Sequence, residues 1–147
     1  MKKTVRFICV ILVCSLLLAV PAQAESIVEP RASSFFSSYG TDLYKTSSTS
    51  FQIWFDVVAN AGSSPQVLGV SEIILYRSAD QQTWKKMKTY IMESYSCMVA
   101  QNTYSHDGYV SYNFANTGYY YRAYITFYAK NSTGIGERYV YTEILRM

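Results

Sequence analysis

The chain has 147 residues, of which 50% are hydrophobic, and a formal net charge of +3. Lys2, Lys3 and Arg6 stand before an apolar run at 7–20 and supply the whole surplus of positive charge. Without them acidic and basic residues are equal in number, so charge gives no argument for a nucleic-acid partner or an anionic membrane.

The first predicted element is a secretory signal peptide over residues 1–24. A basic start, an apolar run and a small-residue stretch ending at Ala24 are the layout of a signal with an A-x-A cleavage site. The apolar run is short for a membrane span. We therefore expect a protein that is cleaved before Glu25 and is secreted or associated with the cell envelope. No stable membrane insertion is expected after cleavage.

Cleavage would also remove Cys9 and Cys14, which leaves Cys97 as the single thiol. An internal disulfide is then impossible, so the domain must be stabilised by burial of apolar side chains. Lipid attachment at Cys14 is an alternative, although Val13 is bulky for the residue before such a cut.

Residues 25–32 are predicted to form an N-terminal extended arm, because Pro30 favours extended backbone. The rest, 33–147, is predicted to be one β domain. Its many tyrosine, phenylalanine, threonine and valine residues favour strands, and apolar residues do not recur at helical spacing.

The clearest strand is predicted at 50–59. Phe51, Ile53, Phe55 and Val57 alternate with polar residues and with Trp54, which predicts one buried face and one solvent face. Other strands are expected at 33–38, 41–45, 70–77, 83–91, 109–114, 119–130 and 137–145, with hairpin turns at 78–82 and 131–136.

Segment 92–107 has no regular pattern and is predicted to be a long loop with one short strand or turn. Seven or eight short strands separated by turns are the number expected for an antiparallel, two-sheet β-sandwich. The predicted fold class is therefore all-β.

The stretch 119–125 followed by Asn131 and Gly134 resembles the penultimate strand and the next loop of fibronectin type III domains, which belong to the immunoglobulin-like sandwiches. This resemblance implies that Tyr119 forms the structural tyrosine corner. The stretch 75–80, with Trp84 after it, resembles the central hairpin of the same domain, and Trp84 would be structural as well.

The whole chain also resembles a family of small secreted proteins of unassigned function from Gram-positive, clostridia-like gut bacteria. The shared features are Glu29-Pro30-Arg31, the stretch 43–46, the strand 51–56, the stretch 87–90 and the strand 119–130. The resemblance implies export and a sandwich, but no functional site.

Cys97 and His106 are the candidates for nucleophilic catalysis, which requires a thiolate and a base. The sequence has no cysteine-protease signature, and we expect Cys97 to be buried or half-buried as a small hydrophobe and His106 to lie in a polar turn. One histidine and one cysteine cannot complete a zinc site, and no Asp-rich calcium loop is present. We therefore predict no enzyme, no metal and no cofactor.

The outward aromatic residues are the candidate binding residues. If alternate residues of the two best strands face the core, then Trp54, Tyr120, Tyr124 and Tyr128 face outward. Such side chains suit glycan or protein contacts, but they also form cross-strand ladders that stabilise a sheet.

The leading hypothesis is a secreted interaction module that binds an extracellular glycan or protein through an aromatic sheet face. A second hypothesis is a structural protein that associates with its own copies through edge strands. A third is a small secreted enzyme or toxin that uses Cys97 and His106.

Overall fold

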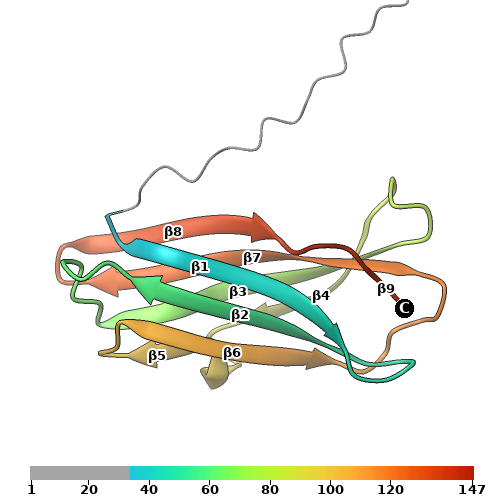
Figure 1. The fold of residues 1–147 in the computed structure, drawn as a ribbon, viewed down its shortest axis with the longest axis horizontal. Helices are drawn as coiled ribbons and strands as arrows, with labels where there is room; N and C mark the ends of the chain where they lie inside the picture. Colours follow the sequence, from blue (N-terminus) through green and yellow to red (C-terminus); the bar gives the residue numbers. More distant parts are fainter. Residues whose placement is uncertain (1–33) are drawn as a thin grey trace, which may run out of the picture. The chain divides into compact units, whose positions relative to one another are not determined.

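The computed structural model describes residues 34–147; the predicted signal peptide and arm lie outside the described residues. These residues form an all-β sandwich of two antiparallel sheets, as predicted (Figure 1). The smaller sheet has the order β1-β2-β6, and the larger has the order β4-β3-β7-β8, with β5 also paired to β3 and β9 to β7. The strands are β1 (Phe36–Lys45), β2 (Phe51–Ala59), β3 (Val67–Ser78), β4 (Lys85–Ile91), β5 (Val99–Gln101), β6 (Ser105–Tyr112), β7 (Tyr120–Asn131), β8 (Gly134–Tyr141) and β9 (Leu145–Arg146), and the 3-10 turn η1 (Ser96–Met98) precedes β5.

The core lies between the two sheets and follows the predicted alternation. In β2 every second side chain from Phe51 to Val57 is buried, whereas Trp54 lies on the opposite face. Buried side chains of β3 and β7 meet them from the larger sheet: Leu68, Val70, Ile73, Leu75, Tyr121, Ala123, Ile125 and Phe127. Burial of these apolar side chains is the main stabilising contribution to the fold.

A β-bulge in β3 explains why its sequence pattern is ambiguous. The pairing with β7 shifts between Val70 and Glu72, so Ser71 is an extra residue in the ladder. Such a residue inverts the alternation. As a result Val70 and Ile73 both face the core although they are three residues apart, and Ile74 faces outward.

Three predicted stretches differ from the structure. The strand expected at 137–145 is divided, since β8 ends at Tyr141 and β9 pairs separately with the start of β7. The expected strands 33–38 and 41–45 are one continuous strand, β1, because β1 pairs with β2 along its length and Gly40 lies inside this ladder. Segment 92–107 is not a single loop, since it contains η1, β5 and the start of β6. The polar residues that begin β6 adopt strand structure because they pair with the strongly patterned β2.

The tyrosine corner is formed by Tyr121, so the prediction of Tyr119 was wrong. The Tyr121 hydroxyl accepts a hydrogen bond from the backbone N–H of Asn116 at 2.8 Å, and its ring is fully buried. Tyr119 also has a structural role, but a different one: it packs against the core edge, and the Arg77 guanidinium lies 4.5 Å from its ring centroid.

The turn between β3 and β4 is organised by the side chain of Asp80. Its Oδ1 atom accepts hydrogen bonds from the N–H groups of Gln82 and Thr83 and from the Ser78 hydroxyl, at 2.8 to 2.9 Å. The backbone bonds of Thr83 and Gln82, followed by the Ser78 bond, lower the pKa of Asp80 from 3.8 to about 2. The turn predicted around Asp80 is therefore confirmed, with the carboxylate as its central acceptor.

We expect this turn to weaken in acid. Because the pKa of Asp80 is lower in the folded chain, its stabilising contribution is complete above pH 3.8 and is lost as the pH falls toward about 2. The measurement is the unfolding midpoint of wild type and Asp80→Ala between pH 7 and pH 2. The difference between the two proteins should be largest at neutral pH and should shrink below pH 3.8. A difference that does not change with pH would contradict this role of the carboxylate.

Candidate functional site

Three aromatic side chains form a stripe across the outer face of the smaller sheet. Tyr44 lies on β1, Trp54 on β2 and Tyr109 on β6. The register places Trp54 opposite Tyr109 on one side and opposite Asp42 on the other, two residues before Tyr44. The ring centroid of Trp54 lies 6.0 Å from that of Tyr44 and 4.9 Å from that of Tyr109. Tyr44 is 54% exposed and Tyr109 is 44% exposed. We call these three residues the aromatic stripe.

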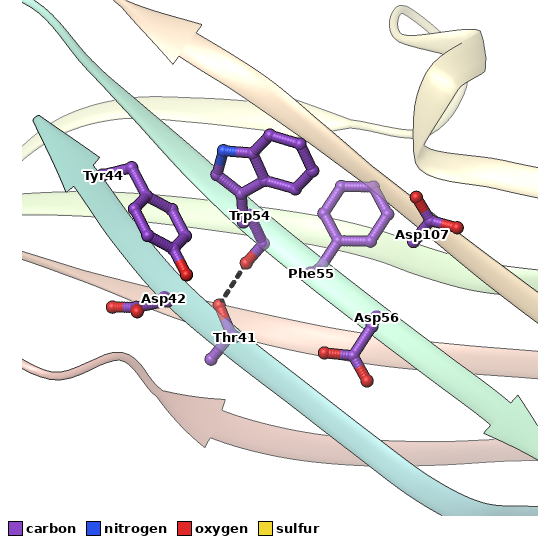
Figure 2. A pocket seen from close by; sticks show the side chains of 7 residues that line it. All are labelled: Thr41, Asp42, Tyr44, Trp54, Phe55, Asp56 and Asp107. Carbon is purple, nitrogen blue, oxygen red and sulfur yellow. Dashed lines mark hydrogen bonds between the residues drawn. The ribbon is translucent and has the colours of Figure 1, made fainter. Parts of the chain in front are cut away.

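Polar groups hold the stripe in position. The Trp54 indole N–H donates to the side-chain oxygen of Gln52 at 3.0 Å, and the Thr41 hydroxyl donates to the backbone oxygen of Trp54 at 2.7 Å, the bond drawn in Figure 2. These bonds fix the indole ring on the sheet before any ligand arrives. An ordered ring loses little entropy on binding.

Two adjoining hollows flank the stripe. One, of about 370 Å³, is open and shallow and is lined by Tyr44, Gln52 and Trp54. The other, of about 230 Å³, lies toward Asp42, Asp56 and Asp107. Figure 2 shows the three carboxylates around Trp54, each carried by a different strand. Flat apolar rings and hydrogen-bond acceptors therefore share one surface.

The outer face of this sheet is acidic. Asp56 and Asp107 are direct cross-strand partners, and neither carboxylate has a hydrogen bond or ion pair with another described residue. No lysine or arginine occupies an outward position of β1, β2 or β6 between Ser38 and Tyr44, Gln52 and Val58, or Ser105 and Ser111. The carboxylates thus keep their accepting oxygens available to a ligand.

The four predicted binding residues lie on two different sheets. Trp54 belongs to the aromatic stripe, whereas Tyr120, Tyr124 and Tyr128 belong to β7 in the larger sheet. Tyr128 is 9% exposed, and its ring therefore offers little surface to a ligand. Tyr120 is half-buried, with the guanidinium of Arg146 at 5.7 Å from its ring centroid. The four residues cannot contact one ligand together.

Tyr124 is the member of the β7 row that lies in a second aromatic cluster. It stacks on Tyr139 at 6.0 Å and packs against Tyr141 at 4.8 Å, both from β8. Burial raises the pKa of Tyr124, and the hydrogen bond to Glu137 raises the pKa of Tyr139. Both phenols therefore stay neutral near pH 7. This cross-strand ladder fits the alternative in which the outward tyrosines stabilise the sheet and do not bind a ligand.

Trp84 fixes the β3–β4 turn. Its indole N–H donates to the backbone oxygen of Gln81 at 3.1 Å, and its ring lies under the guanidinium of Arg122, with 4.1 Å between the guanidinium carbon and the ring centroid. Arg122 also lies 4.5 Å from the ring centroid of Tyr141. The expected structural role of Trp84 thus has a physical basis in this contact.

Cys97 and His106 contact each other through the wrong atoms for a catalytic dyad. The His106 Nε2 atom lies 2.9 Å from the backbone oxygen of Cys97, an acceptor, so Nε2 carries the proton. The Cys97 thiol instead points to the backbone oxygen of Tyr109, at 3.6 Å. Two expectations were wrong: Cys97 is exposed, because Met98 takes the buried position of η1, and His106 lies in β6, where its ring packs on Phe55.

Residues 34–147 contain neither a cluster of metal-binding side chains nor a membrane-spanning helix. No three side chains among the histidine, cysteine and acidic residues of this range are placed to hold a metal ion together. Within the same range, no helix has the length and apolar character that crossing a bilayer requires.

Comparison with known proteins returned no relative: no protein-family model matches the chain, and no curated protein matches its sequence.

Proposed function

We propose that the protein binds an uncharged extracellular glycan on the outer face of β1, β2 and β6. The observation that carries this proposal is the aromatic stripe with the unpartnered carboxylates Asp56 and Asp107 beside it. The apolar faces of sugar rings pack on flat aromatic side chains, while carboxylates accept hydrogen bonds from ring hydroxyls. A glycan uses both kinds of group at once.

The stripe is suited to a short run of sugars. Its three rings come from three adjacent strands, so it runs across the strands, and strands in a sheet lie about 4.8 Å apart. A linear glycan would lie in the same direction, with one edge against the carboxylates and the other against Gln52 and Ser111. The hollows are open and shallow, which suits a ligand that is bound along its length and not at its end.

The proposal includes secretion and a fibronectin type III-like sandwich. Support for export comes from the signal-like layout of residues 1–24. Support for the fibronectin-like architecture comes from the hairpin β3–β4 and the tyrosine-corner strand β7, which lie side by side in one sheet, and from the Asn131 side chain, which accepts hydrogen bonds from Thr133 and Gly134 in the turn to β8.

The test is a glycan array followed by titration of the strongest uncharged hit. Trp54→Ala should weaken binding by about 2 kcal/mol, or about 30-fold, since it removes the central ring of the stripe. Tyr124→Ala is the matched control, because it removes an outward aromatic residue from the opposite sheet, and it should leave affinity unchanged. If no uncharged glycan binds, or if Trp54→Ala binds as wild type does, the proposal is wrong.

A further inference from the structure

The larger sheet carries a second, chemically different surface, centred on Arg122. This residue lies on β7, between β3 and β8 in the sheet order, and aromatic rings approach it from both neighbouring sides. Trp84 comes from the β3–β4 turn and Tyr141 from β8, at 4.1 and 4.5 Å from the guanidinium carbon. The guanidinium group is thereby held in one place.

The hydrogen-bonding capacity of Arg122 is unused. Its side chain forms no hydrogen bond or ion pair with the described residues, and its Nε atom is buried without any acceptor. Among residues 34–147, Nε of Arg122 is the one buried side-chain nitrogen or oxygen atom without a hydrogen-bond partner. The two Nη atoms also have no partner, and because they are not buried they are open to solvent. An acceptor on a ligand can therefore reach the Nη atoms, whereas Nε lies out of its reach.

We infer that Arg122 binds the carboxylate of an acidic sugar on the outer face of the larger sheet. Two aromatic rings lie within 4.5 Å of the guanidinium carbon, and the N–H groups that they leave free match the two oxygens of a carboxylate. A guanidinium group is also more weakly hydrated than an ammonium group, so it loses less hydration when it binds an anion.

The surroundings of Arg122 favour a sugar ring as the carrier of this carboxylate. Tyr141 is 50% exposed and Tyr139 is 55% exposed, and Tyr124 joins them in a continuous aromatic surface beside the guanidinium. Lys86 pairs with Tyr76, which in turn pairs with Arg122, so a second positive charge lies in the same cross-strand row. Glu72 and Glu137 also lie on this face, beside Tyr124 and Tyr139, so the positive charge is concentrated at the row of Arg122 and Lys86. The stripe on the other sheet has carboxylates beside it and would repel an acidic ligand.

The probe is an oligogalacturonate, compared by calorimetry with its methyl ester, in which the ring is the same and the carboxylate is masked. We expect the acid to bind at least tenfold more tightly than the ester. Arg122→Lys keeps the charge but removes the planar guanidinium group with its paired N–H donors and its contacts with the aromatic rings. This variant should bind the acid about tenfold more weakly, or weaker still. Trp54→Ala should leave this binding unchanged, which separates it from the glycan site proposed above.

A second measurement does not depend on how the variants fold. In wild-type protein labelled with nitrogen-15, the Arg122 side-chain N–H signals should shift on addition of the acid and stay in place on addition of the ester. Equal binding of acid and ester, unaltered binding by a folded Arg122→Lys protein, unshifted Arg122 signals, or no binding of the acid would each overturn the inference.

Discussion

Replacing Tyr121 by alanine should lower the free energy of unfolding by about 3–5 kcal/mol, the range seen when a large aromatic side chain is deleted from a core. Tyr121 is fully buried and packs against Phe51 and Tyr112, with ring centroids at 5.1 and 6.1 Å. It also carries the corner hydrogen bond to Asn116. Chemical denaturation at pH 7 provides the measurement.

Two further substitutions separate the corner bond from the packing. Tyr121→Phe keeps the ring but loses the acceptor of the Asn116 N–H group, and it should lower the free energy of unfolding by about 1 kcal/mol. Tyr119→Phe is the matched control and should change the free energy of unfolding by less than about 0.5 kcal/mol. If Tyr119→Phe is the more damaging of the two, the corner has been assigned to the wrong tyrosine.

The second large effect is expected at Gly69, where β3 meets the end of η1. Gly69 has a φ of 153°, and a Cβ atom added there would collide with the backbone oxygen of Met98 and lie 2.7 Å from the Cα atom of Val99. Gly69→Ala combines an unfavourable backbone conformation with overpacking against backbone, and it should lower the free energy of unfolding by roughly 3–5 kcal/mol.

Gly62→Ala is the control for this prediction. A Cβ atom at Gly62 meets nothing within 4 Å, so this change should alter the free energy of unfolding by less than about 0.5 kcal/mol. Urea denaturation of both variants provides the comparison. Equal midpoints for the two variants would show that β5 and η1 can move away from β3 at little cost.

The sequence predicts strands where burial follows local alternation. In β2, each of the buried residues Phe51, Ile53, Phe55 and Val57 was identifiable from period-2 spacing alone. In β3 the same rule is ambiguous, because the bulge at Ser71 depends on pairing with β7 and leaves no local signal. In β6 the rule fails, since the strand begins with polar residues and glycine, and it pairs with a strand about fifty residues earlier in the chain.

The tyrosine corner shows a different limit. Tyr119 and Tyr121 have the same parity along the strand, so alternation puts both on the core side and cannot distinguish them. What distinguishes them is the path of the turn that brings the Asn116 N–H group to the Tyr121 hydroxyl. That path depends on tertiary structure.

The candidate site was predictable only in part, for a similar reason. Alternation places Trp54 on the outer face, as the structure confirms. Tyr44 and Tyr109 lie 10 residues before it and 55 after it, and only the register of three strands brings the rings together. Tyr120, Tyr124 and Tyr128 share a local pattern with each other, but they belong to the other sheet. A sequence pattern identifies a face of one strand, whereas a binding surface requires several strands in register.

The pairings of the central strands also determine how the chain must fold. Phe51 of β2 pairs with Tyr112 of β6, and Ile73 of β3 pairs with Ile125 of β7, so both central ladders join residues that are far apart in the sequence. Closing such long loops costs chain entropy before the contacts form, and proteins dominated by distant pairings fold in milliseconds to seconds. We therefore expect the chain to fold on this slower timescale, and the edge of β2 would be open to aggregation for as long as β6 has not paired with it.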